Sequence, residues 1–244
     1  MNWLESLQAY CERTDAGFWS EPINALSNIA FLVSAFVAAR LLKRSECSDR
    51  EAFLLIIILG FVGVGSFIFH TFATRWAEVL DILPIASFVM CYLIFGLKRY
   101  FDLGAKPIVF CCFIFVLSLS FVIKESHLLN GSILYAPPFV ALWGFVIVMI
   151  MRGAGEAADY NSYKLSIVLL GGGVFAFGVS LLFRTMDRAL CAQIPIGTHF
   201  IWHLLNAFVL YLLTAALIVF RDKNAAAFMM RWLRRRPAKT PMCR

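Results

Sequence analysis

The sequence predicts an all-α integral membrane protein, a single bundle of seven transmembrane helices. The chain of 244 residues is 61% hydrophobic and has a mean hydropathy of +0.79, whereas soluble domains are only about half apolar. Seven apolar segments reach the roughly 20 residues that a helix needs to cross the hydrocarbon core. They are too long for barrel strands, and backbone polar groups must be paired in lipid, so helices follow. The connecting segments are short, and residues 1–244 are therefore predicted to form one domain.

The helices can be justified in chain order. The first follows Pro22, a favoured first helical residue, and the acidic Glu21 before it complements the helix dipole. The second ends near His70, a short turn leads to the third close to Asp81, and the seventh begins at His199. The predicted spans are residues 23–42, 52–73, 79–97, 107–124, 133–151, 163–184 and 199–220.

The flanking segments differ in charge, and this difference predicts an orientation. Four of the five charged residues in 1–22 are acidic, which is not typical of a signal peptide, and residues 221–244 form a basic tail. With seven spans, the tail shares one side of the membrane with the first, third and fifth loops. All but five of the 22 lysines and arginines fall on that side, the others being Arg13, Arg75, Lys124, Arg184 and Arg188. The positive-inside rule then places the C-terminus in the cytoplasm and the N-terminus outside. The tail is interpreted as an anchor to anionic lipid, and no nucleic-acid partner is expected.

Cysteine placement suggests a bridge and not a metal motif. None of the seven cysteines forms a C-x-x-C pair, so a structural zinc or redox motif is not indicated. Cys11 and Cys191 both fall on the predicted outer side, where disulfides are chemically permitted. Their pairing is a hypothesis from the sequence.

Polar residues near the outer ends of three spans are unexpected in a purely lipid-facing role. The stretch GSFIFHTFATRWAEVLDILP carries Ser66, His70 and Asp81, and the later stretch GTHFIWHLLNAF carries His199 and His203. Residues four apart lie on one face of a helix, so both the S-x-x-x-H and the H-x-x-x-H pairs point in one direction. Ionisable residues inside membrane spans are costly and usually functional. These five residues are predicted to converge if the second, third and seventh helices are neighbours.

The residue types indicate a metal-dependent hydrolase. Three imidazoles with one open position form the ligand set of a catalytic zinc. HFIWH lacks the glutamate of the H-E-x-x-H motif, so Asp81 is the candidate base. Two alternatives remain open from the residues alone. The histidines could form only interhelical hydrogen bonds, or two could ligate a haem, which would leave the third histidine and Asp81 unexplained. His127 and Glu78 are given no role, as a solvated loop residue and an interfacial residue.

The N-terminal segment YCERTDAGFWSEPINALSN clusters Glu12, Asp15 and Glu21. Carboxylates at this density suit a hard cation such as calcium, which prefers oxygen ligands. Helix capping at Glu21–Pro22 explains the same acidic residues, and spacing alone favours capping.

Taken together, these stretches resemble the alkaline ceramidases and, more widely, a superfamily of seven-helix membrane hydrolases that includes adiponectin-receptor-like and GPI-remodelling proteins. The resemblance runs from about Tyr10 to Leu213. It is carried by the stretches YCERTDAGFWSEPINALSN, GSFIFHTFATRWAEVLDILP, LLFRTMDRALC and GTHFIWHLLNAF. Its specific part is the ordered set S-x-x-x-H, Asp, H-x-x-x-H on the second, third and seventh helices.

The resemblance implies residue roles. Zinc would be held by His70, His199 and His203, with Ser66 and Asp81 as the remaining catalytic residues. A calcium site would use Glu12, Glu21 and the Tyr10 carbonyl. Eukaryotic members place an aspartate where this chain has Ala9, and here Asp15 is expected to supply the missing charge.

The expected function is therefore zinc-dependent, ceramidase-like hydrolysis of a membrane lipid amide, releasing a fatty acid and a sphingoid base, with calcium as a second ion. Two alternatives are a glycerolipid esterase or phospholipase-type hydrolase on the same site, and a non-enzymatic receptor-like protein. The sequence does not distinguish an amide from an ester substrate, and it leaves the oligomeric state open.

Overall fold

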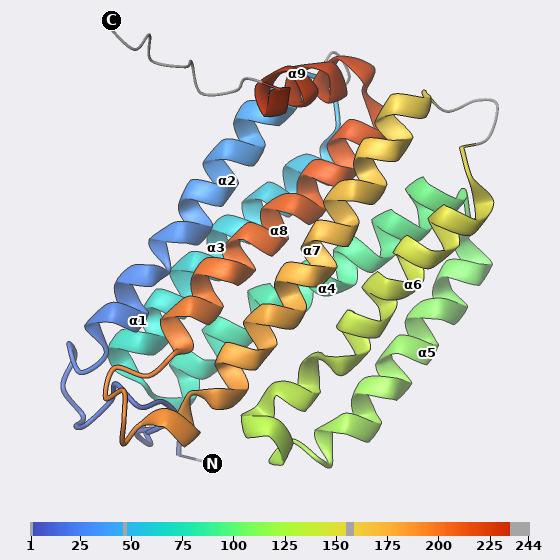
Figure 1. The fold of residues 1–244 in the computed structure, drawn as a ribbon. Helices are drawn as coiled ribbons and strands as arrows, with labels where there is room; N and C mark the ends of the chain where they lie inside the picture. The colour runs from blue at the N-terminus through green and yellow to red at the C-terminus, as the bar shows by residue number, and fades with distance from the viewer. Residues whose placement is uncertain (1, 46–47, 155–158, 235–244) are drawn as a thin grey trace, which may run out of the picture.

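The computed structural model describes residues 2–45, 48–154 and 159–234, and these residues form helices and loops (Figure 1). Seven helical segments are long and apolar enough to cross a membrane, which confirms the predicted all-α class and the number of spans. The first span, Pro22–Leu42, consists of α1 (Pro22–Ser27) and α2 (Ile29–Leu42), and the fifth joins the 3₁₀ helix η1 (Leu128–Tyr135) to α6 (Ala136–Arg152). The other spans are α3 (Arg50–Phe72), α4 (Arg75–Phe101), α5 (Ala105–Ile123), α7 (Tyr160–Met186) and α8 (His199–Arg221).

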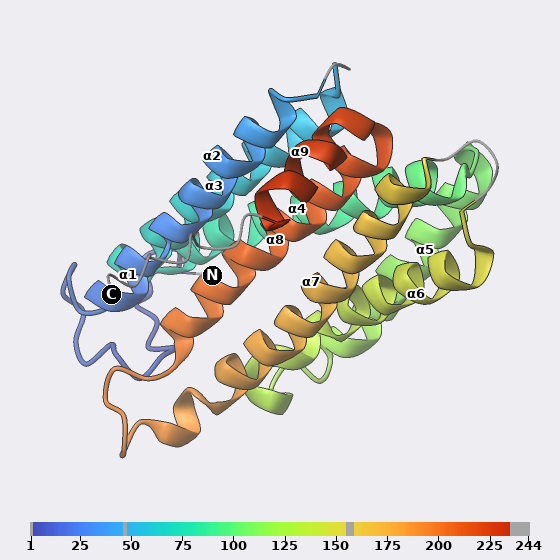
Figure 2. The ribbon, with the colours of Figure 1, turned by 45° about the horizontal axis from the view of Figure 1, so that its top comes forward.

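Helix α8 lies at the centre of the bundle. It packs against α7, α2 and α3, and it is the most buried of the seven spans. Its residues 212–219 are buried on every side of the helix, as expected for a run that is apolar all round. Helices α5 and α6 lie at one side of the bundle in both ribbon views (Figures 1 and 2), where α6 packs against α7, and α5 is the most exposed span. The polar residues of α8 therefore sit in the best-enclosed part of the molecule.

The turn between α3 and α4 is tighter than expected. Ala73 ends α3 in the left-handed region with φ of 43°, and α4 begins at Arg75, four residues before the predicted start of that span. Asp81 thus lies in the second turn of α4, and the prediction that it opens the helix is wrong. The two helices touch along their backbones at Gly65, where a Cβ atom would overlap the carbonyl oxygen of Leu80. Glycine at this contact lets α4 carry Asp81 up to α3.

The Cys11–Cys191 disulfide is present and confirms the hypothesised pairing. It joins the N-terminal segment to the loop between α7 and α8, which includes the short 3₁₀ helix η2 (Arg188–Leu190). The same loop is organised by Asp187, a fully buried residue whose Oδ1 accepts hydrogen bonds from the backbone N–H groups of Thr198 (2.6 Å) and His199 (3.0 Å). Asp187 therefore fixes the first turn of α8.

The two ends of the bundle carry different segments. The N-terminal segment lies at one end, and the amphipathic helix α9 (Lys223–Arg234) lies across the other (Figures 1 and 2). Ala225, Ala226 and Met229 of α9 are buried against the bundle, while Lys223 and Arg231 are exposed. This placement suits the predicted interfacial anchor, of which residues 235–244 lie outside the described part of the chain.

A buried ion pair fixes the bundle at the end that carries α9. Arg99 of α4 donates to both carboxylate oxygens of Asp49, with Nη1–Oδ2 and Nη2–Oδ1 distances of 2.6 and 2.9 Å, and it also contacts Glu51. Asp49 in turn caps α3 by accepting from the Ala52 N–H. Burial by itself would raise the pKa of the Asp49 carboxyl, but the hydrogen bonds from Arg99 and Ala52 bring that pKa below its ordinary value.

We expect Asp49→Asn to lower the free energy of unfolding by about 1–3 kcal/mol, because asparagine still caps the helix but leaves the buried guanidinium with less compensation. Since the pKa of Asp49 is lowered on folding, its stabilising effect exists above the unfolded pKa of about 3.9 and is lost as the pH falls through the folded value. The melting difference between wild type and variant in detergent should therefore shrink below about pH 4. Glu125→Gln, which changes an exposed carboxylate, is the control. A difference that stays constant with pH would contradict this role.

Candidate metal centre

Three buried histidines meet at the end of the bundle that carries the N-terminal segment. His70 comes from α3, and His199 and His203 come from the first turns of α8. One ligand nitrogen from each lies within 4.8 Å of the others. Each residue is at most 2% exposed. The structure thus brings together the three side chains that the sequence predicts to converge.

Hydrogen bonds leave the free nitrogens of two rings available. The His70 Nδ1 lies 2.6 Å from the Glu21 carboxylate, so it carries the proton and Nε2 keeps its lone pair. The Ser27 hydroxyl donates its single proton to the Asn24 carbonyl (2.7 Å) and therefore accepts from His203 Nδ1 (2.7 Å). His203 Nε2 then also keeps its lone pair. Carboxylate and hydroxyl partners of this kind are typical of metal-ligating histidines, because they fix the tautomer and the ring orientation.

Two of the three histidine rings contain buried nitrogen atoms without partners. His70 Nε2 and His199 Nδ1 are inaccessible and make no hydrogen bond within the described residues. An unpaired buried acceptor is costly, and a bound cation would remove this cost. The ring of His199 is held by stacking on Tyr10, with the ring centroids 3.6 Å apart. Three neutral imidazoles with an open position match the donor set of a zinc ion.

Ser66 and Asp81 lie beside the histidines. Ser66 is buried one helical turn before His70, and Asp81 approaches it from α4 across the Gly65 contact. The Asp81 side chain faces the cavity next to Ser66, and its Oδ1 has no hydrogen-bond partner among the described residues. Glu78, one turn earlier on α4, instead forms a partly exposed ion pair with Arg75, which agrees with its omission from the site.

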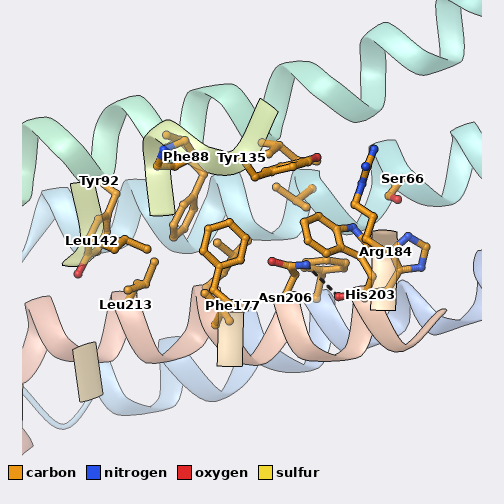
Figure 3. Close-up of a pocket in the computed structure, with 18 of the residues that line it drawn as sticks. Ser66, Phe88, Tyr92, Tyr135, Leu142, Phe177, Arg184, His203, Asn206 and Leu213 are labelled. Carbon is orange, nitrogen blue, oxygen red and sulfur yellow. Dashed lines mark hydrogen bonds between the residues drawn. The ribbon is translucent and has the colours of Figure 1, made fainter. Parts of the chain in front are cut away.

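A cavity extends from these residues into the bundle. Ser66, Arg184 and His203 mark its polar end in Figure 3, whereas Tyr92, Leu142 and Leu213 mark the opposite end. Between the two ends the walls are formed largely by apolar and aromatic side chains, among them Phe88 and Phe177. The cavity therefore presents a small polar head region and a long apolar tail region.

Arg184 is a site residue that the sequence reasoning did not identify. Its guanidinium lies over the rings of Tyr135 and Trp202, 5.3 and 5.6 Å from their centroids. Nη1 donates to the Asn130 carbonyl at 2.6 Å, which fixes the side chain at the polar end. The sequence did carry one signal for this residue, because Arg184 is a charged side chain at the end of a predicted span. Ser27 gave no signal, because its contact with His203 joins residues 176 positions apart.

The residues of the predicted calcium site lie together, but their side chains have other contacts. Glu12 accepts from the backbone N–H groups of Ile23 (2.7 Å) and Asn24 (2.8 Å), and it thereby caps α1. Burial raises the pKa of the Glu12 carboxyl. Asp15 is exposed and accepts from the Gly17 N–H. Glu21, predicted to cap the helix, makes no capping hydrogen bond.

Glu21 instead forms a buried pair with His70 and Arg13. Burial would raise the pKa of the Glu21 carboxyl, but the hydrogen bonds from His70 and Arg13 and the charge of Arg13 hold it below its ordinary value. The carboxyl is therefore an anion in the folded protein, and it orients His70. His127 lies in an exposed loop near Glu125, as expected for a residue without a role.

Comparison with known proteins supplies one match. A family model described as Ceramidase matches residues 5–241, nearly the whole chain, which confirms the resemblance drawn from the motifs. A search of curated proteins found no match.

Proposed function

This chain belongs to the ceramidase family, and we propose that it is a zinc-dependent intramembrane hydrolase that cleaves the amide bond of ceramide-like lipids. Family membership supports hydrolysis of ceramide. The observation that carries the metal-dependent mechanism is the group of three buried histidines with available nitrogens, placed beside Ser66 and Asp81 at the polar end of an apolar cavity.

His70, His199 and His203 would hold the zinc, and Glu21 and Ser27 would orient the first and the last of them. When bound, zinc would polarise a carbonyl and lower the pKa of a bound water to about 7. The protein's part is to fix the tautomers of His70 and His203, to hold the His199 ring against Tyr10, and to keep all three rings buried away from bulk water.

Asp81 would serve as the general base and then as the general acid. Its carboxylate faces the cavity with one oxygen unpartnered, so that oxygen is free to accept a proton from the attacking water. The same proton is then delivered to the nitrogen of the leaving sphingoid base. Such a transfer contributes typically 10²–10⁴-fold to a rate.

Ser66 would donate a hydrogen bond to the carbonyl oxygen as negative charge develops on it. A nucleophilic role is less consistent with the site, because no imidazole would remain free to activate the serine hydroxyl if all three histidines hold the metal. The rings of His70 and His203 are each held through Nδ1 and offer their remaining nitrogen to the metal.

The tail region of the cavity would bind the acyl chain. Its far end is lined by Tyr92, Leu142 and Leu213, and the Tyr92 hydroxyl is paired with that of Tyr100, so this end suits a hydrocarbon. A neighbouring apolar groove between α5 and α6 shares Phe145 and Ala141 with the cavity, which supports lateral access from the bilayer.

We expect Leu213→Phe to shift the chain-length preference. The larger side chain occupies the far end of the tail region, so turnover of long-chain ceramide should fall about 10-fold or more relative to a short-chain analogue. The measurement is the ratio of the two rates, which does not depend on the amount of folded enzyme. Leu204→Phe, the same substitution at an exposed position of α8, is the control. Equal loss on both substrates would place the acyl chain elsewhere.

The orientation proposed here puts the histidines and the N-terminal segment outside and α9 in the cytoplasm. It is supported by the positive-inside rule and by the disulfide at the histidine end of the bundle, since disulfides persist in oxidising compartments.

The test of the proposed function is incubation of purified protein with ceramides and glycerolipids, followed by mass detection of released fatty acid. Release from ceramides, with the matching sphingoid base, is the expected result. Release from glycerolipids alone would assign an esterase, and a zinc-loaded protein that cleaves no lipid in the panel would favour the receptor-like alternative.

A further inference from the structure

The N-terminal segment contains a built-in cation. Arg13 is 4% exposed, and its guanidinium lies inside the group of acidic residues that the family resemblance assigns to calcium. Nε contacts Glu21 Oε1 at 2.5 Å. Nη1 donates to the carbonyls of Asp15 and Gly17 at 3.2 and 3.3 Å, and Nη2 donates to the His70 carbonyl at 3.0 Å.

These acceptors have the chemistry of a calcium site. One carboxylate and three backbone carbonyls surround a single positive charge, and carboxylates and carbonyls are the ligands that a hard cation prefers. Arginine is permanently charged and carries five donors in a rigid fork, so it satisfies several oxygens at once. A calcium ion at the same place would have to displace the guanidinium and would be repelled by it.

The remaining carboxylates are also engaged. Both oxygens of Glu12 accept backbone N–H groups of α1. The second oxygen of Glu21 is taken by His70 Nδ1 and by the Asn24 amide at 3.1 Å. Two buried amide oxygens nearby, Asn24 Oδ1 and Asn28 Oδ1, have no partner among the described residues. They are neutral, and they do not replace the carboxylates that a calcium site requires.

We propose that Arg13 takes the place of the calcium ion in this chain, and that it positions His70. The guanidinium holds His70 twice, directly at its carbonyl and through Glu21 at its Nδ1. The segment is then ordered without calcium, and the calcium site implied by the resemblance does not fit the residues present. The positioning part of this proposal rests on the proposed zinc site, whereas the calcium part does not.

The experiment uses full-length protein in detergent, stripped of divalent ions. Calcium is titrated to about 10⁻³ M, the weak end of natural calcium sites, while the melting temperature is followed. We expect no saturable rise for wild type. A saturable rise in melting temperature would overturn the calcium part of the proposal, even if the two free amide oxygens caused it. This outcome does not depend on whether the protein binds zinc.

Zinc affinity is then measured by competition with a chromophoric chelator, well below the melting temperature of each variant. Arg13→Ala should bind zinc about 10- to 100-fold more weakly, as expected when an outer partner of a ligand is lost. Arg13→Lys should be intermediate, because an ammonium group keeps the charge but not the fork. Arg75→Ala, which breaks a partly exposed pair with Glu5, is the matched control and should bind as wild type does. Wild-type affinity in Arg13→Ala would overturn the positioning role, whereas absence of zinc binding in wild type would contradict the proposed function instead.

Discussion

Replacing Asp81 with asparagine is expected to reduce ceramide hydrolysis by about 10²–10⁴-fold while zinc stays bound. Asparagine has nearly the same shape as aspartate but neither accepts nor delivers a proton at neutral pH. The metal should be retained, because the three nitrogens that lie within 4.8 Å of one another all belong to histidines. The measurements are the rate of fatty-acid release and the zinc content of the same purified sample.

A neighbouring position on α4 supplies the control for this variant. Glu78→Gln makes the same chemical change one helical turn earlier, in a partly exposed pair with Arg75, and should leave the rate unchanged. A fully active Asp81→Asn enzyme would exclude Asp81 as the base. Loss of zinc together with activity would instead make Asp81 part of the metal centre.

The helix count and the shared direction of His199 and His203 were predictable because both depend on local sequence, whereas their meeting with His70 required α3 and α8 to be neighbours. A run of about 20 apolar residues specifies a span wherever it occurs. Spacing of four residues puts His199 and His203 on one face of a helix. The start of α4 was missed because the turn that precedes it uses a left-handed alanine, Ala73, for which the sequence carries no warning.

Contacts between distant segments were not predictable in the same way. The Glu21–His70 and Ser27–His203 hydrogen bonds join residues 49 and 176 positions apart, and only the folded chain shows which nitrogen each ring offers. The acidic residues before α1 suggested calcium because the sequence does not show that Arg13 turns inward among them. Charge counted along the chain therefore does not show that the charges of this segment compensate one another in space.

Replacing His203 with alanine is expected to remove zinc and activity together. Two imidazoles from two different helices would remain, which is one nitrogen fewer than the three protein ligands of a catalytic zinc site. The zinc content of protein purified without added metal should fall from about one ion per chain to a trace, as determined by elemental analysis.

Two further variants separate loss of a ligand from general damage to the site. Ser27→Ala keeps the His203 ring but removes the hydroxyl that accepts from its Nδ1, so zinc affinity should fall only about 10- to 100-fold. His127→Ala removes an exposed imidazole and should change nothing. If His203→Ala kept a full complement of zinc, the three histidines would not be the ligands, and a structural hydrogen-bonding role would account better for their burial. A graded series, with His203→Ala below Ser27→Ala and Ser27→Ala below wild type, would instead tie the metal to the nitrogen that the serine leaves free.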